Sequence, residues 1–314
     1  MNNILIIGGS GYIGGFLTDY LKWNNYDVTV YDNIMYETRY LKNNKFIYGD
    51  IRDKNKLLSI FPDYDIVIWL AAIVGDGACA VDKFLTQSIN EDSVKWVVDN
   101  YKGKLIYMST CSVYGINEDL IDESAPTNPI SIYAETKLAA EQYILKNHKN
   151  HLIFRIGTLF GTGDEHSRIR FDLVVNILAK KATLKQPLTV FGGEQWRPLL
   201  HVKDVSTAIK FGIENNINGL YNLSYGNYII ADIAKEIQKL IPDAKVTFQD
   251  MPFEDLRNYR VKADKFLNLG WIPQYTLKDG IIEINKVLLE NRIKNINDPI
   301  YSNEGYLNKN YFKI

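Results

Sequence analysis

The chain has 314 residues, a formal net charge of −1, 46% hydrophobic residues and 23% charged residues. This composition is typical of a globular protein with one large or two modest domains. A charge so near zero gives no general attraction to nucleic acid or to anionic membrane. No apolar run reaches the length of a membrane span, and the N-terminus MNNILIIGGSG has no basic leader, so we expect a cytoplasmic protein without membrane partners.

The cysteines and histidines argue against metal or disulfide chemistry. Cys79 and Cys111 are the only two cysteines, and the four histidines show no metal-ligand spacing. We therefore expect no bound metal, no disulfide framework and a reducing compartment. The two thiols either line an active site or, as we favour, fill space as small buried residues.

The first half of the chain alternates short apolar runs with helical patterns. Helices are predicted over residues 12–23 and 88–101. Strands are predicted over residues 3–8, 27–32, 45–50, 65–72, 104–110 and 151–157. This alternation predicts βαβ units and a parallel sheet, and the lack of strict apolar alternation suits strands covered on both faces.

After about Gly161 the pattern changes to a smaller α/β region. Helices are predicted over residues 171–182, 203–216 and 230–241, and short strands over 187–192, 219–224 and 245–249. The tail after Asn291 is rich in Asn and Tyr, and it is either loosely ordered or wraps the domain.

A glycine motif follows the first predicted strand. Gly8, Gly11 and Gly14 stand at GxxGxxG spacing, where a helix begins. Glycines there allow a tight turn and let the backbone approach a pyrophosphate, and the helix N-terminus favours its charge. The motif therefore predicts a dinucleotide site rather than merely a tight turn.

The second strand ends in Asp32, eighteen residues beyond Gly14. A carboxylate there can accept hydrogen bonds from a ribose and repels a 2′-phosphate, and the nearest arginine is Arg39. The position favours NAD over NADP, although an Asp that only ends a strand would look the same.

Two further motifs bring reactive groups into the pattern. Tyr133 and Lys137 are four residues apart in a helical run, which places both on one face. Thr110 ends a predicted strand, at the sheet edge where ligands bind in α/β proteins. Together, Tyr133, Lys137 and Thr110 indicate a reactive site rather than an ordinary Tyr–Lys pair on a helix surface.

With these motifs the whole chain resembles the NAD-dependent epimerase/dehydratase family, the extended short-chain dehydrogenases/reductases that act on nucleotide-linked sugars. GDIRD, LAA, RPLLHVKDV and LRNYRVKADKFLNLGW match further family segments. The resemblance implies a Rossmann-type doubly wound parallel sheet in residues 1–165 and a smaller, interleaved α/β substrate-binding region in residues 166–314. It also implies a nucleotide-diphosphate sugar as the substrate and NAD as the cofactor. The implied cofactor residues are Gly8, Gly11, Tyr12, Ile13, Gly14, Asp32, Asn33, Asp50, Ile51, Leu70, Ala71, Ala72, Tyr133 and Lys137.

The resemblance also assigns catalytic roles. Tyr133 is the implied acid/base, Lys137 holds the nicotinamide ribose, and the Thr110 hydroxyl bonds the sugar oxygen. We expect the neighbouring ammonium and the positive nicotinamide to lower the pKa of Tyr133. Where dehydratases of the family carry an Asp–Glu pair, this chain has Cys111 and Ser112, which argues against a 4,6-dehydratase.

What remains is oxidation at one sugar carbon, most simply C4. Such a chain is a nucleotide-sugar 4-dehydrogenase or a 4-epimerase, and a non-catalytic NAD-binding regulator is a third reading. The loop AAIVGDGACAVDKF and the segment RFDLVVN resemble a subset of the family from bacterial surface-sugar pathways, including GDP-heptose 4-dehydrogenases of capsule biosynthesis.

Substrate and partner contacts follow from the same resemblance. The implied substrate-binding residues are Thr110, Cys111, Thr158, Asn176, Arg197 and Arg257. Arg260 competes with Arg257 for a diphosphate, and His201 is expected to pack or cap rather than catalyse. The helices over 88–101 and 132–147 imply a homodimer, which could pair into a tetramer, and we expect Trp96 and Leu138 on their exposed faces.

Overall fold

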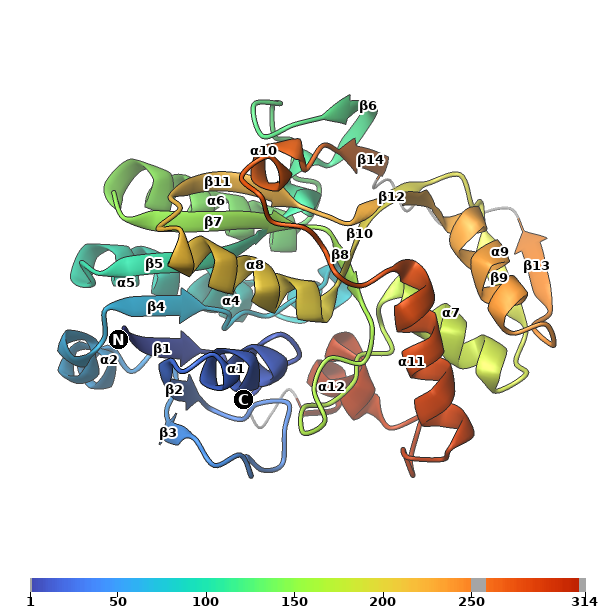
Figure 1. Cartoon of the computed structure of the whole chain (residues 1–314), viewed down its shortest axis with the longest axis horizontal. Helices are drawn as coiled ribbons and strands as arrows, with labels where there is room; N and C mark the ends of the chain where they lie inside the picture. The colour runs from blue at the N-terminus through green and yellow to red at the C-terminus, as the bar shows by residue number, and fades with distance from the viewer. Residues whose placement is uncertain (1, 250–257, 311–314) are drawn as a thin grey trace.

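The computed structural model describes residues 2–249 and 258–310. Its centre is a seven-stranded parallel sheet in the order β11-β7-β5-β4-β1-β2-β3 (Figure 1). The strands are β1 (Asn3–Ile7), β2 (Asp27–Asp32), β3 (Lys45–Tyr48), β4 (Ile66–Trp69), β5 (Lys104–Thr110), β7 (His151–Ile156) and β11 (Gly219–Leu223). The six strands predicted in the first half all join this sheet, and the predicted Rossmann-type fold is confirmed.

The apolar runs form strands because both faces of the sheet are covered. Every residue of β4 and β5 is buried, as are the last four of β1. One face packs against α1 (Gly14–Trp23) and α8 (Val202–Glu214), and the other packs against α5 (Ser93–Asn100) and α6 (Ile132–Asn147). This double cover explains why the strands lack alternation.

The helix predicted over 88–101 is longer than its pattern indicated. It begins with α4 (Lys83–Gln87), passes through a π-helical turn (Ser88–Asp92) and continues as α5. The expectation for Leu138 is wrong, because it is 9% exposed and packs inside its own chain with Val113 and Val261. Trp96 is half-buried, and its ring packs against that of Phe61.

The second half builds a smaller α/β region with its own core. Its main helices are α7 (Val174–Thr183), α9 (Ile230–Leu240) and α11 (Leu277–Leu289). Its strands from the second half are β8 (Thr158–Phe160), β9 (Leu188–Phe191), β10 (Trp196–His201), β12 (Gly226–Ile229), β13 (Val246–Gln249) and β14 (Asn258–Val261). The first half contributes β6 (Ile116–Ile121), which pairs with β14. The remaining short helices are α2 (Lys54–Ile60), α3 (Asp76–Val81), α10 (Asp264–Leu267) and the 3₁₀ turns Phe61–Asp63, Cys111–Tyr114 and Pro299–Tyr301.

The C-terminal tail is an ordered element as far as it is described. It ends in α12 (Asn303–Asn310), which packs against α3 near the carboxyl ends of the sheet strands (Figure 1). The Glu304 carboxylate lies so close to Gly77 that a Cβ there would be only 2.2 Å from it. The tail therefore wraps the domain.

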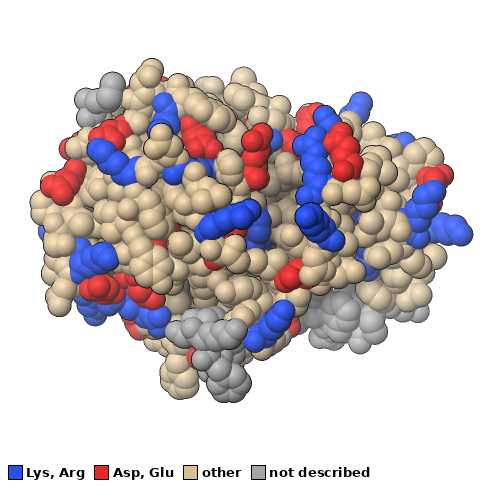
Figure 2. Space-filling model, turned by 90° about the horizontal axis from the view of Figure 1, so that it is seen from below, with Lys and Arg blue, Asp and Glu red and all other residues tan. Residues whose placement is uncertain are grey.

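The surface carries both signs of charge. Figure 2 shows basic and acidic side chains interspersed over one face, which suits the net charge of −1. None of the helices within residues 2–249 and 258–310 is both long and apolar enough to cross a membrane.

Candidate active site

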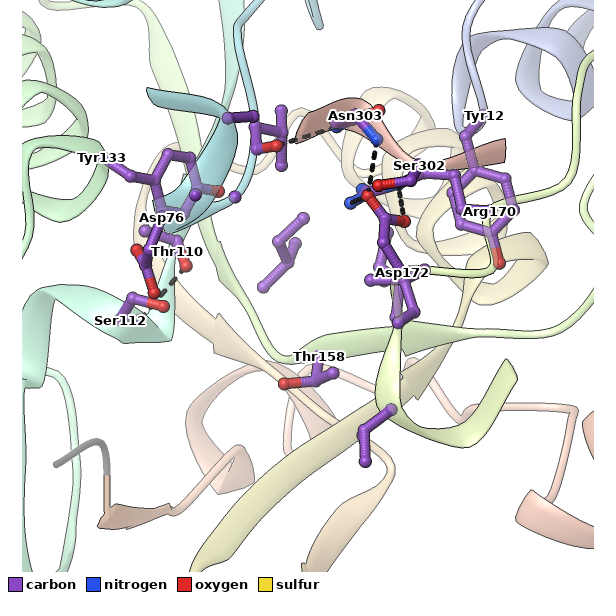
Figure 3. Close-up of a pocket in the computed structure, with 18 of the residues that line it drawn as sticks. Tyr12, Asp76, Thr110, Ser112, Tyr133, Thr158, Arg170, Asp172, Ser302 and Asn303 are labelled. Atoms are coloured by element: carbon purple, nitrogen blue, oxygen red, sulfur yellow. Dashed lines mark hydrogen bonds and ion pairs between the residues drawn. The ribbon is translucent and has the colours of Figure 1, made fainter. Parts of the chain in front are cut away.

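A cavity of about 700 Å³ opens at the carboxyl edge of the sheet, between the sheet and the smaller region. Tyr133, Thr110 and Asp76 lie on one side, and Tyr12 and Arg170 lie on the other (Figure 3). A second cavity of about 120 Å³ adjoins the first, because both are lined by the glycine loop. Gly8, Gly11, Tyr36, Leu70 and Ala72 line both cavities, which lie side by side at the carboxyl ends of the strands.

The glycine loop has the shape that a dinucleotide requires. Gly8 has φ +88°, and a Cβ on it would lie 2.5 Å from the backbone nitrogen of Ala71. A Cβ on Gly14 would lie 2.5 Å from the Gly8 oxygen, so both positions need glycine. A Cβ on Gly11 would meet only the Gly8 oxygen, at 3.5 Å, which leaves open space in front of the loop. The residues present therefore fit a pyrophosphate beside the start of α1.

Asp32 faces the smaller cavity. Its Oδ2 accepts from the Ser10 backbone N–H at 3.0 Å, and its Oδ1 accepts from that of Ile34 at 2.7 Å. The carboxylate is thus held beside the glycine loop, where a ribose hydroxyl would reach it. Every cofactor residue implied by the family resemblance lines one cavity or the other: Gly8, Gly11, Tyr12, Ile13, Gly14, Asp32, Asn33, Asp50, Ile51, Leu70, Ala71, Ala72, Tyr133 and Lys137.

The smaller cavity also holds a carboxyl group that the sequence did not indicate. Glu37 lines it, and burial raises the pKa of this carboxyl to about 7 although the Arg168 backbone N–H donates to it at 2.7 Å. Nothing in the spacing of Glu37 distinguishes it from a surface residue.

Tyr133 stands in the first turn of α6, whose start is fixed by Ser131. The Ser131 hydroxyl accepts from the Ala134 N–H at 3.2 Å and donates to Asp76 at 2.7 Å. Thr110 ends β5, and its oxygen accepts from the Ser112 N–H at 3.1 Å. These caps aim the tyrosine and threonine hydroxyls into the same end of the cavity (Figure 3).

Burial dominates the acidities of the Tyr133–Lys137 pair in the absence of ligand. It raises the pKa of Tyr133, while a hydrogen bond with Thr110 and the charge of Arg170 act in the opposite direction. Burial also lowers the pKa of Lys137 to about 7, and its ammonium lies 4.1 Å from the centre of the Tyr107 ring. Burial is the largest influence on the pKa of Tyr133 in this structure, and the lowering that we expect from Lys137 together with a bound nicotinamide stays a prediction.

The opposite wall comes from a loop before α7 and from the tail. Arg170 pairs with Asp172 at 2.9 Å, and the backbone N–H of Asn303 donates to the same carboxylate at 2.8 Å. The Tyr12 hydroxyl donates to the Gly161 oxygen at 2.5 Å. Sequence reasoning gave neither Arg170 nor Asn303 a role, although Arg170 begins the segment RFDLVVN.

Two substrate residues that the resemblance implied point elsewhere. Cys111 is buried in the core, where its thiol donates to the Arg155 oxygen at 3.2 Å. Asn176 is fully buried, with its amide bonded to the Gly161 and Arg170 backbones. Neither lines the cavity, because the short helix after β5 turns Cys111 inward and the loop before α7 occupies the amide of Asn176.

The other implied residues are distributed as follows. Thr110, Thr158 and Arg197 line the cavity, and Arg257 lies outside the described residues. The Arg260 guanidinium donates to the Glu118 oxygen and lies over Trp196, away from the cavity lining.

Two residue types have the structural roles that we expected. His201 caps α8 by accepting from the Lys203 N–H at 3.2 Å. The Cys79 thiol donates to the Ile73 oxygen at 3.2 Å in the core, so both cysteines fill space.

Comparison with known proteins agrees with this geometry. The model of the NAD dependent epimerase/dehydratase family matches residues 4–224. A relative from Methanocaldococcus jannaschii, named "Putative UDP-glucose 4-epimerase", is 31% identical over 304 residues, covering 88% of this chain and 95% of the relative. The dTDP-glucose 4,6-dehydratase of Haemophilus influenzae is 27% identical over 342 residues, covering 93% of this chain and 99% of the relative.

Solved structures share the fold. UDP-glucuronic acid 4-epimerase from Bacillus cereus, in complex with UDP-glucuronic acid and NAD, superposes with a TM-score of 0.77 at 26% identity, covering 92% of this chain and 99% of that one. The family match spans the glycine loop, Thr110, Tyr133 and Lys137, and the cofactor predicted from the glycine loop and Asp32 is the one in the family's name. The chain therefore belongs to the NAD-dependent epimerase/dehydratase family, whose members related to it act on nucleotide sugars.

Proposed function

We propose that this protein uses NAD to oxidise a nucleotide-linked sugar at C4, and that it leaves the product as a 4-ketone. The residues that would hold NAD are the glycine loop, Asp32 and Lys137. When bound there, NAD accepts a hydride from a carbon.

Tyr133 takes the proton of the sugar hydroxyl in this proposal, and Thr110 holds that hydroxyl. Both side chains line the cavity at one end, and the Ser131 cap and the Ser112 N–H orient them. The buried phenol resists ionisation without ligand, so its deprotonation depends on a positive charge arriving beside it. Oxidised NAD, held by the glycine loop, Asp32 and Lys137, would supply that positive charge.

The observation that carries the proposal is the absence of an acidic pair after Thr110. Cys111 points into the core, and Ser112 bonds the Tyr259 hydroxyl at 3.2 Å. Neither can protonate and deprotonate adjacent carbons, as elimination of water requires. The nearby Asp76 carboxylate is engaged by Ser131. Oxidation without dehydration is the chemistry that these residues support.

A 4-epimerase is the second candidate, because the similar proteins described above include 4-epimerases. The same proton acceptor and the same hydride transfer serve both reactions, and they differ in whether the hydride returns to the other face of the ketone.

For the substrate we propose GDP-D-glycero-α-D-manno-heptose, in a pathway of bacterial capsular polysaccharide. The support is the resemblance of the loop over residues 71–84 to that subset of the family. Arg197 lines the cavity and offers a guanidinium for the diphosphate. We further propose that the protein acts as a homodimer.

One experiment tests the reaction. Purified protein is incubated with NAD and with GDP-, UDP- and dTDP-linked sugars, the heptose included, and products are followed by mass spectrometry and by cofactor absorbance. A dehydrogenase yields reduced cofactor and a sugar lighter by two hydrogens. A C4-inverted sugar of unchanged mass with no net reduction assigns the epimerase, and a product lighter by one water contradicts both.

A further inference from the structure

Arg168 presents a half-buried guanidinium at the edge of the cavity. Its Nη1 donates to the Ile300 oxygen at 2.6 Å, and its Nη2 donates to the Asn303 side-chain oxygen. The guanidinium carbon lies 4.2 Å from the centre of the Tyr36 ring. Its protein partners are thus two neutral oxygens and an aromatic face.

The carboxylates of Asp172 and Glu37 act on the charge of Arg168 from a distance. Within residues 2–249 and 258–310, no carboxylate forms an ion pair with it, whereas the neighbouring Arg170 pairs with Asp172. Burial and the adjacent Arg170 lower the pKa of Arg168, and they outweigh Tyr36, Asp172 and Glu37, which act in the opposite direction. A partly buried cation that forms no ion pair is well placed to bind an anion.

The position of Arg168 indicates which anion. Its backbone N–H donates to Glu37 in the smaller cavity, and the Ser167 hydroxyl beside it donates to the Ser10 oxygen of the glycine loop at 3.0 Å. Tyr36 lines both cavities, and in the described structure its buried hydroxyl has no hydrogen-bond partner. Arg168 therefore stands where the two cavities meet, opposite the start of α1.

Asn303 ties this wall to the other side of the cavity. Its side-chain N–H donates to the Val74 oxygen at 2.8 Å, and its backbone N–H donates to Asp172 at 2.8 Å. Asn303 is 3% exposed, and Figure 3 shows it between the Tyr133 side and the Arg170 side. The tail thus forms a strap, residues 299–310, whose Ser302, Asn303 and Glu304 line the cavity wall.

We propose that Arg168 binds the pyrophosphate of NAD, and that the strap holds Arg168 in place and retains the cofactor. The inference rests on the proposed use of NAD. A dinucleotide with its ribose at Asp32 and its nicotinamide near Tyr133 must carry its pyrophosphate past the junction of the cavities. A guanidinium there supplies charge-assisted hydrogen bonds opposite those of the helix N-terminus.

The test compares full-length wild type with Arg168→Gln, Arg168→Lys and Asn303→Ala, after stripping any copurified nucleotide. Arg292→Ala is the matched control, because this arginine is exposed and pairs with Glu290. Affinities for NAD and for adenosine are measured by titration calorimetry, and NAD dissociation by stopped-flow fluorescence.

We expect Arg168→Gln to bind NAD about 10- to 100-fold more weakly, the effect of losing charged hydrogen bonds, with adenosine affinity unchanged. Arg168→Lys keeps the charge, so its affinity for NAD should lie between those of wild type and Arg168→Gln. Asn303→Ala should release NAD faster than wild type, and Arg292→Ala should match wild type. The lysine and asparagine variants keep the test valid if Arg168→Gln does not fold.

Three results would overturn the inference. If both Arg168 variants bind NAD as tightly as wild type does, Arg168 does not contact the pyrophosphate. If the Arg168 variants lose as much affinity for adenosine as for NAD, the role of Arg168 is structural. A loss of GDP or UDP affinity in NAD-saturated protein, with NAD affinity intact, assigns Arg168 to the substrate diphosphate. If wild type itself fails to bind NAD, the proposed function falls instead.

Discussion

Replacing Tyr133 by Phe should abolish most of the hydride transfer while leaving the fold intact. The ring stays buried and only the hydroxyl is lost, so the variant removes the proton acceptor alone. A positioned acid/base is worth roughly 10²–10⁴ in rate, or about 3–5 kcal/mol of barrier. Thr110→Ala removes one hydrogen bond, worth about 0.5–1.5 kcal/mol, so its rate should fall by about two- to thirteenfold.

The structure supplies a control for the second change. The Thr110 oxygen also accepts the Ser112 N–H, so Thr110→Ala removes a cap as well as a substrate contact. Thr110→Ser keeps both the cap and the substrate contact, so its rate of hydride transfer should be close to that of wild type. Because the two hydroxyls act on one substrate oxygen, the double variant should cost less than the sum of the single ones.

The assay is a single turnover with saturating sugar nucleotide, followed by the absorbance of the reduced cofactor. Binding is measured separately, so that a change in rate is not confused with lost affinity. A rate for Tyr133→Phe within about threefold of wild type, far below the expected loss, would refute the assignment. If the barrier increases of Tyr133→Phe and Thr110→Ala simply add in the double variant, the two hydroxyls do not act on the same substrate oxygen.

Three further predictions concern cofactor choice, acid stability and assembly. Asp32→Ala should narrow the preference for NAD over NADP in a binding titration, and a wild type that binds both equally would contradict this reading. Burial raises the pKa of Glu283, but hydrogen bonds from His201, Lys203 and the Thr162 N–H outweigh it and lower the pKa to about 2. The stability from Glu283 is therefore present above its ordinary pKa of 4.5 and is lost as the pH falls toward 2. Glu283→Gln should flatten the dependence of the melting temperature on pH in that window, and an unchanged slope would contradict it. Light scattering at micromolar concentration should give the mass of a dimer, and a monomer would contradict the helix-pair contact.

The parts of the fold with a local signal could be read from the sequence. The six apolar runs became neighbouring strands, and the glycine spacing placed Gly8 at the end of β1, because both patterns depend on residues close together in the chain. The order of β11 beside β7 could not be read, since it depends on packing between segments far apart.

Side-chain direction was the main obstacle at the site. Cys111 follows Thr110 directly, yet the turn after β5 sends one side chain into the core and the other into the cavity. Leu138 was placed on a surface because its cover, Val261, is more than one hundred residues away. Asn303 joins two distant walls by three hydrogen bonds, and no spacing in the sequence announces such contacts.

The place of β11 at the edge of the sheet bears on how the chain is made. A growing chain that has produced only residues 1–165 would leave β7 as an open edge, with Leu152, Ile153 and Phe154 lacking the cover they have in the finished molecule. Unpaired apolar edges invite association with other chains. The seven-stranded layer is therefore complete only after residue 223 has been synthesised, when much of the smaller region has already been made.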